Sequence, residues 1–526
     1  MPSSAPARTE QQWLDLVRAQ ILRSGPVSAA SALVDALRAF PGSFELRRIL
    51  AGIHSQTRQP VEAETLLREL LQERPGDAAS ALAFARLLLE QARASEAARV
   101  ARDFFAESPR DPECAIRIIE LLDEADRKPD AAAIAEQAIA LTPADSRLHA
   151  YAGMLQLQLG DFELARDHYS RVMRDSAQAC EWGAPLGLAS AQRYTDSTHP
   201  DFGLFRTSLQ REDLSDKARS ALLFGLGKAH DDVGDYARAA ACFREANSLA
   251  HAISGWSRKD WRRAVEARLA APVIPHPADG YADFIPVFIV GMPRSGTTLL
   301  AELLARHPRV CNRGELPWIA KSAQSPDLAG TPNRMALEHH AARYRVRAMQ
   351  DDAGDSGWFI DKQPLNFRYV DLMLAMFPNA KIIHCRRNPR DTALSLWMQS
   401  FNEPVQGYAC EFDAIAVVMR DCTRLMRRWR ERFPESIRTV DYERLVTDTQ
   451  AIVTGLSEWV GLPPAGQTAR NTASSSNAIS SASLWQARQP IHRDSIGRWK
   501  HYAPYVPELA RAIPEAESTL ADSSGN

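Results

Sequence analysis

Four prolines in the first part of the chain recur at a constant spacing. They stand 34 residues apart, at Pro41, Pro75, Pro109 and Pro143. Proline lacks a backbone N–H and has a fixed φ, so each is expected to lie just past the second helix of a repeated unit. A period of this length is typical of a solenoid of two-helix units. At 526 residues the chain exceeds one core, and we expect a helical-repeat domain followed by at least one other domain.

Small and aromatic residues inside the unit support the repeat. In the unit from Pro143 to Ser176, the positions where two helices of a hairpin would touch hold Gly153, Ala165 and Tyr169. This pattern resembles the tetratricopeptide (TPR) repeat, and it resumes after an irregular stretch near 178–215 with Gly227, Ala239, Phe243 and Ala246. The resemblance implies five to six units and a concave groove that could hold an acceptor peptide; self-association, including a homodimer, or capping of a catalytic domain are alternatives.

Composition changes at 271–286, where prolines cluster, and we expect a linker there. Residues 1–270 would form an all-α TPR solenoid. Residues 287–510 alternate short apolar strands with amphipathic helices, which indicates a P-loop-like α/β domain with a parallel sheet. Residues 511–526 are expected to be a C-terminal tail.

Charge and cysteine content exclude several functional classes. The formal net charge is −2, which gives no reason to expect nucleic acid as a partner. The seven cysteines are scattered without metal-ligand spacing, so we expect neither disulfides nor a metal. The sequence shows neither a signal-peptide pattern nor a membrane span, and we expect a cytoplasmic protein.

Residues 287–304 read as an apolar strand, a glycine-containing loop and a helix. Gly291 and Gly296 would let the backbone approach a phosphate, and the start of the helix would offer N–H groups. The position of the Walker lysine holds Thr297, and a later apolar strand, at 381–385, runs into arginines instead of a metal-binding aspartate. ATP hydrolysis is therefore disfavoured. A magnesium-dependent kinase remains a rival hypothesis.

The second strand is followed by Arg386, Arg387 and Arg390. Ligands of open α/β sheets bind at the carboxyl ends of the strands, so these charges are expected near the first loop. Arg386 and Arg390 could equally form a solvated basic face.

The motif PRSGTT at 293–298 resembles that of the sulfotransferase superfamily. It is most similar to the tyrosylprotein and TPR-linked bacterial branches of that superfamily. The resemblance covers about 286–505 and implies binding of 3′-phosphoadenosine 5′-phosphosulfate (PAPS), with 3′-phosphoadenosine 5′-phosphate as product and no metal. It implies that the donor is contacted by Arg294, Ser295, Gly296, Thr297, Thr298, Arg387, Ser395, Tyr442, Ser483, Arg498 and Lys500.

The same resemblance implies the catalytic residues. Glu315 would be the base, and Lys362 and Arg294 would balance the charge that develops during transfer. The branch usually carries two adjacent glutamates, whereas Gly314 precedes a single one here. A histidine base is the alternative, with His384 as the candidate. Asp361 is expected to orient its segment.

The acceptor is expected to be a tyrosine of a peptide or protein, because the glutamate position and the repeats both favour it. A carbohydrate or a phenolic small molecule is the alternative acceptor. An alternative of another class is a TPR interaction module joined to an inactive nucleotide-binding domain.

Overall fold

A computed structural model describes residues 8–57, 59–107, 111–350, 354–401, 404–464 and 493–514. The chain divides into two compact units. One comprises Met1–Tyr151 and Gln350–Asp352, and the other comprises Ala152–Met349 and Ala353–Asn526.

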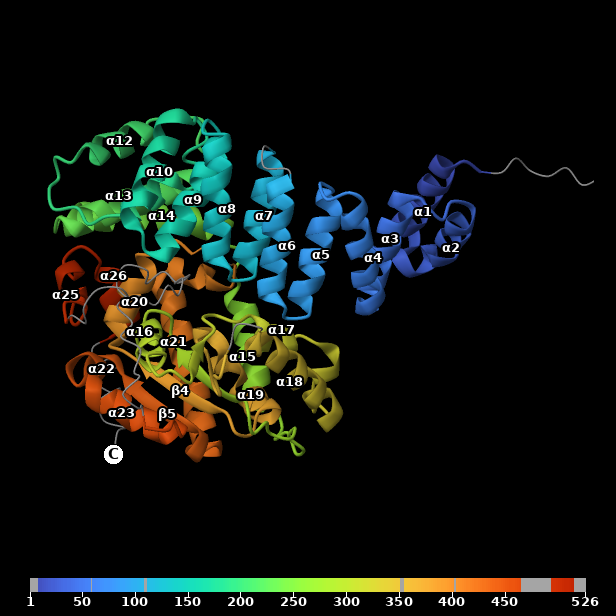
Figure 1. The fold of residues 1–526 in the computed structure, drawn as a ribbon. Helices are drawn as coiled ribbons and strands as arrows, with labels where there is room; N and C mark the ends of the chain where they lie inside the picture. Colours follow the sequence, from blue (N-terminus) through green and yellow to red (C-terminus); the bar gives the residue numbers. More distant parts are fainter. Residues whose placement is uncertain are drawn as a thin grey trace, which may run out of the picture. The chain divides into compact units, whose positions relative to one another are not determined.

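The first unit is a succession of helices in which consecutive helices pair as hairpins (Figure 1). Pro41, Pro75 and Pro143 each lie just past the end of a helix, as predicted; Pro109 lies outside the described residues. The elements are α1 (Glu10–Ser24), η1 (Pro26–Ala29), α2 (Ala30–Ala39), α3 (Phe44–Gln56), α4 (Pro60–Glu73), α5 (Ala78–Glu90), α6 (Ala94–Glu107), α7 (Pro112–Glu124) and α8 (Lys128–Leu141).

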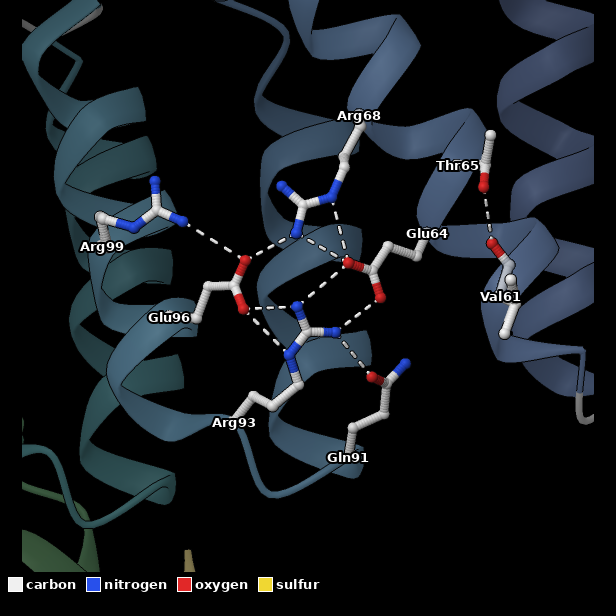
Figure 2. Close-up of polar contacts among 8 residues, drawn as sticks. All are labelled: Val61, Glu64, Thr65, Arg68, Gln91, Arg93, Glu96 and Arg99. Atoms are coloured by element: carbon white, nitrogen blue, oxygen red, sulfur yellow. Dashed lines mark hydrogen bonds and ion pairs between the residues drawn. The ribbon is translucent and has the colours of Figure 1, made fainter. Parts of the chain in front are cut away.

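An arginine–glutamate network links neighbouring hairpins of the first unit (Figure 2). Arg68 on α4 reaches Glu96 on α6 at 2.6 Å, and Arg93, just before α6, reaches Glu64 on α4 at 2.6 Å. The hydrogen bond from Arg93 lowers the pKa of Glu64, and that from Arg68 lowers the pKa of Glu96. Because each carboxylate is shared by two arginines, the network holds α4 against α6.

The second unit begins within the repeats, since α9 (Ser146–Leu159) crosses the division between the units. A Cβ atom added to Gly153 would lie 3.1 Å from the ring of Tyr169, and one added to Gly227 would lie 2.7 Å from the ring of Phe243. The helices of these hairpins therefore touch where the sequence predicted. The further helices of this part are α10 (Phe162–Asp175), α11 (Ala184–Ser190), α12 (Pro200–Leu209), α13 (Asp216–Asp232), α14 (Tyr236–Ile253) and α15 (Arg258–Ala270).

A five-stranded sheet follows, with all strands parallel in the order β2-β3-β1-β4-β5. The strands are β1 (Ile285–Gly291), β2 (Val310–Asn312), β3 (Trp358–Asp361), β4 (Lys381–Arg386) and β5 (Ile437–Asp441). A region of helical hairpins followed by a domain with a parallel sheet confirms the predicted fold class.

Helices cover both faces of this sheet. Val287 and Ile289 of β1 belong to a core shared with α16 and α23, whereas Phe288 and Val290 belong to a core on the opposite face. The elements around the sheet are α16 (Thr297–Leu304), α17 (Trp318–Ala323), η2 (Pro326–Leu328), α18 (Arg334–Met349), η3 (Pro364–Tyr369), α19 (Val370–Met376), α20 (Pro389–Trp397), η4 (Pro404–Cys410), α21 (Phe412–Arg432), η5 (Pro434–Ser436), α22 (Tyr442–Thr447), α23 (Thr449–Val460), α25 (Trp499–Tyr502) and α26 (Pro507–Ala512).

Helices α13 to α15 contribute side chains to the core that contains Phe288 and Val290 of β1. The indole of Trp261 on α15 donates to Asp421 on α21 at 3.0 Å. Asn247 on α14 donates to the carbonyl of Trp397, the last residue of α20, at 2.7 Å. The compact units consequently divide at 151/152, and the composition change at 271–286 falls inside one of them.

Candidate functional site

The carboxyl end of each strand is followed by residues that the sequence placed in the site. In the sheet order these are Glu315 after β2, Lys362 after β3, the loop 292–296 after β1, Arg387 after β4 and Tyr442 after β5. Because all five strands are parallel, these residues lie along one edge of the sheet.

The loop between β1 and α16 has a backbone that demands glycine at two positions. At Gly291 φ is 144°, and a Cβ there would lie 2.3 Å from the carbonyl oxygen of Cys385; at Gly296 φ is 92°, and a Cβ would lie 2.6 Å from the ring of Tyr442. Arg294 also adopts a positive φ, of 70°. The Ser295 hydroxyl donates to the Met292 carbonyl at 2.7 Å. A tight turn thus leads directly into the first turn of α16, where backbone N–H groups lack intrahelical partners.

Three arginines converge behind this loop. They are Arg294, Arg387 and Arg498. The Nε of Arg294 donates to the hydroxyl of Ser395 on α20 at 3.0 Å. Arg387 donates through Nη1 to the Arg294 carbonyl at 3.0 Å and through Nη2 to the Ser495 carbonyl at 2.5 Å. Burial, followed by the charges of Arg387 and Arg498, lowers the pKa of Arg294 to about 9. Mutual repulsion of buried cations favours the binding of an anion among them.

One donor of this cluster is left over. The Nε of Arg387 is buried and has no hydrogen-bond partner within the described part of the chain. The guanidinium packs 4.7 Å from the ring centre of Tyr442, which also contacts the loop at Gly296. A buried donor without a partner is costly, so this position suits a phosphate oxygen.

Glu315 and Lys362 form an ion pair between the Glu315 Oε1 and the Lys362 Nζ. The lysine side chain is only 5% exposed, and that of the glutamate is 31% exposed. The backbone N–H of Lys362 donates to the Gly314 carbonyl at 2.7 Å, which joins the segments after β2 and β3. Gly314 has φ +62°, a conformation that a side chain rarely adopts, so a glutamate at this position would strain the backbone.

Asp361, the last residue of β3, supports the Glu315 segment. Its carboxylate accepts from the Leu316 N–H at 3.3 Å and from the Tyr344 hydroxyl at 2.9 Å. Burial raises the pKa of Asp361 to about 7. The sequence predicted that Asp361 orients its own segment, and the structure adds a contact to the backbone one residue after the candidate base.

The C-terminal part of the site is held by carboxylates from α13 and α20. Arg498 forms an ion pair with Asp231 at the end of α13, and Lys500 is exposed. Ser483 lies outside the described residues. Asp391, in the first turn of α20, accepts from the N–H groups of Gly497 at 2.7 Å and Trp499 at 2.9 Å. Sequence reasoning missed Asp231, because nothing in a repeat helix marks it as a partner of a distant arginine.

The remaining charged candidates have structural partners. Arg386 pairs with Asp441 at 2.8 and 3.1 Å, and Arg390 donates to the Ile513 carbonyl at 3.0 Å. His384 lies buried within β4, and burial, helped by nearby arginines, lowers its pKa to about 3. A ring so hard to protonate is a poor base, so the histidine alternative is disfavoured.

Two absences hold for the residues that the structure describes. None of their helices is both long and apolar enough to cross a membrane. They also contain no group of three or more His, Cys, Asp or Glu side chains that could hold a metal ion.

Comparisons with known proteins identify both parts of the chain. The sulfotransferase family matches residues 286–465, and the tetratricopeptide repeat matches residues 26–87 and 116–179. The chain therefore carries TPR repeats and a sulfotransferase domain, as the sequence predicted.

Individual relatives match only in part. An uncharacterized protein of Aquifex aeolicus is 27% identical over 409 residues, which cover 72% of this chain and 52% of the relative. The nodulation protein NoeE of Sinorhizobium fredii is 29% identical over 216 residues, covering 34% and 50%. The chain thus spans about half the length of these curated relatives. The solved sulfotransferase domain of the Synechococcus PCC 7002 olefin synthase has a TM-score of 0.33 at 18% identity, covering 47% of this chain and 98% of that domain.

Proposed function

We propose that the protein transfers a sulfuryl group from PAPS to a hydroxyl group of an acceptor, preferably a tyrosine of a peptide or protein. The observation that carries the proposal is the arrangement of charges along one sheet edge. A buried arginine cluster lies beside the loop 292–296, and a carboxylate paired with a buried lysine follows the two strands on the other side of that loop. The cluster suits a polyanionic donor, and the pair supplies a base next to a cation.

The arginine cluster fits the two phosphate groups that a PAPS molecule carries. Its loop glycines make room for a close backbone approach, and the free Nε of Arg387 offers a donor that needs an acceptor. Arg387 and Ser395 would hold the 3′-phosphate, and the loop 292–296 with Thr297 and Thr298 would hold the 5′ end. Tyr442 would lie beside the adenine.

PAPS, when bound, supplies an electrophilic sulfur whose bond to the 5′-phosphate oxygen breaks during transfer. Glu315 would take the proton of the acceptor hydroxyl, because its side chain is partly exposed and so can be reached. Lys362, buried and fixed against Glu315, would place a positive charge where negative charge develops, and Arg294 would add a second.

The preference for a tyrosine acceptor is supported by the TPR repeats, since repeats of this kind often bind peptides or partner helices. A protein acceptor would thus have a binding region separate from the reacting centre.

Seven free cysteines accord with a reducing, cytoplasmic location.

The test is Glu315→Gln in the full chain. The variant should bind 3′-phosphoadenosine 5′-phosphate as the wild type does in calorimetry, yet transfer sulfate from PAPS roughly 10²- to 10⁴-fold more slowly. Glu338→Gln is the matched control, because Glu338 forms an exposed ion pair with Arg334 on α18. It should transfer at the wild-type rate.

Acceptors to be compared are a tyrosine peptide, an oligosaccharide and a simple phenol, with products identified by mass spectrometry. Sulfation of the oligosaccharide alone would overturn the tyrosine preference. Failure of the wild type to bind the bisphosphate would overturn the assignment of PAPS as the donor. Full activity of Glu315→Gln would show that Glu315 is not the base.

A further inference from the structure

The repeat helix α13 supplies a carboxylate to the C-terminal segment of the candidate donor site. Asp231 pairs through Oδ2 with the guanidinium of Arg498 and accepts through Oδ1 from the hydroxyl of Tyr502 at 2.6 Å. Its side chain is 7% exposed, whereas that of Arg498 remains 32% exposed. The carboxylate is therefore enclosed, and it holds an arginine that still has an open side.

Arg498 belongs electrostatically to the arginine cluster. Its charge contributes to lowering the pKa of Arg294 and that of Arg387, after burial in each case. The geometry agrees, because Arg387 donates to the carbonyl of Ser495, three residues before Arg498, so the segment that carries Arg498 lies against the cluster. Without a carboxylate on its other side, Arg498 would be repelled from this position, and Asp231 supplies that carboxylate.

The backbone around Arg498 is fixed separately from its side chain. Asp391 accepts from the N–H groups of the residues on either side, Gly497 and Trp499. The backbone anchor thus comes from α20, which also carries Ser395, and the side-chain anchor comes from α13. Removing Asp231 would release the guanidinium and the Tyr502 hydroxyl, while the backbone bonds to Asp391 keep the segment attached.

A second contact joins the repeats to the same segment without touching the cluster. Arg244 on α14 pairs with Glu508 on α26 at 2.8 Å and donates to the Tyr505 carbonyl at 2.8 Å. This exposed pair provides a control for docking alone.

We propose that Asp231 is a positioning residue of the donor site, which holds the Arg498 guanidinium beside Arg294 and Arg387 so that three cations face the donor phosphates. The last repeat hairpin, α13 with α14, then contributes to donor binding in addition to any role in binding a partner. The inference rests on the proposed function, because it assigns the cluster to PAPS.

The test is calorimetric titration of the full-length chain with 3′-phosphoadenosine 5′-phosphate. Asp231→Asn keeps the shape and should weaken binding roughly tenfold, the effect of losing one well-placed charge-assisted contact. Arg498→Ala should weaken binding by a similar factor. The double variant should be no weaker than Arg498→Ala alone, because Asp231 acts through Arg498. Asp231→Glu, which keeps the charge, should recover part of the affinity.

Glu508→Gln should bind the bisphosphate within about twofold of the wild type, since it breaks only the outer contact. In steady-state transfer, Asp231→Asn should raise the KM for PAPS more than it lowers kcat. Circular dichroism at the titration temperature shows whether each variant is folded, and a poorly folded Asp231→Asn is replaced by Asp231→Glu and Arg498→Lys in the same cycle.

Three results would overturn the inference: wild-type affinity in Asp231→Asn, additive losses in the double variant, or an equal loss in Glu508→Gln. They differ from failure of the proposed function, in which the wild type itself does not bind the bisphosphate.

Discussion

Arg387→Ala tests the donor site through Arg387 Nε, a buried donor that has no partner among the residues that the structure describes. Two of the guanidinium nitrogens of Arg387 already donate to backbone carbonyls, those of Arg294 and Ser495, while Nε donates to nothing among the described residues. The variant therefore removes the donor that the proposal assigns to the 3′-phosphate. It also removes two contacts that tie the loop 292–296 to the C-terminal segment.

The expected loss of affinity follows from the number of contacts. A hydrogen bond to a charged group contributes about 1.5–3 kcal/mol, and the unused Nε can make one such bond to phosphate. Arg387→Ala should thus bind 3′-phosphoadenosine 5′-phosphate roughly 10- to 150-fold more weakly. Adenosine 5′-phosphate lacks the 3′-phosphate, and its affinity should change by less than about threefold if only the 3′-phosphate contact is lost.

Calorimetry with both nucleotides measures this difference, and a stoichiometry near one confirms that the variant is folded. Arg386→Ala is the control, because Arg386 is the neighbouring arginine but pairs with Asp441. It should bind the bisphosphate as the wild type does. Equal losses for the two nucleotides, or an equal loss in Arg386→Ala, would refute the assignment of Arg387.

Two further predictions concern stability. Burial raises the pKa of Asp361 to about 7, above its value of about 3.9 in an unfolded chain. Between these values the folded state keeps a proton that the unfolded state has lost, so stability falls as the pH rises from about 4 to about 7, by at most roughly 4 kcal/mol. Asp361→Asn should remove that slope in urea unfolding at pH 5 and pH 8; an unchanged slope would show that Asp361 does not titrate there. In the first unit, Arg93→Ala should lower stability by about 1 kcal/mol, because Arg93 joins two carboxylates of a network. Arg99→Ala, which removes two exposed contacts, to Glu96 at 3.3 Å and to Asp103 at 3.8 Å, should cost less than about 0.5 kcal/mol. Equal shifts in the thermal unfolding of the two variants would contradict a special role for Arg93.

Local patterns were enough to predict most of the sheet edge. The strand, loop and helix at 287–304 each have a clear sequence signal, and the structure places them as β1, the glycine turn and α16. The parallel sheet then brings together the residues that follow different strands, since its carboxyl ends share one edge. The pairing of Glu315 with Lys362 is a consequence of that geometry, because β2 and β3 are neighbours.

Long-range contacts could not be predicted in the same way. Asp231 and Arg498 are 267 positions apart, and neither lies in a pattern that points to the other. The phosphate contact predicted for Arg498 stays a prediction, and the structure adds a carboxylate partner from a repeat helix that the sequence did not indicate. Tyr344 was missed for a similar reason, since its bond to Asp361 joins α18 to the end of β3.

The same long-range packing bears on where the catalytic part begins. The sulfotransferase match starts at residue 286, but the compact unit that contains it starts at residue 152. Helices α13 to α15 bury Phe243 and Trp261 in the core shared with α20 and α21. A fragment starting at 286 would expose the apolar surface that these helices cover, and it would lack Asp231. If the proposed function holds, the unit that binds the donor is the sheet domain together with the last repeat helices, since both the core and the position of the Arg498 guanidinium depend on them.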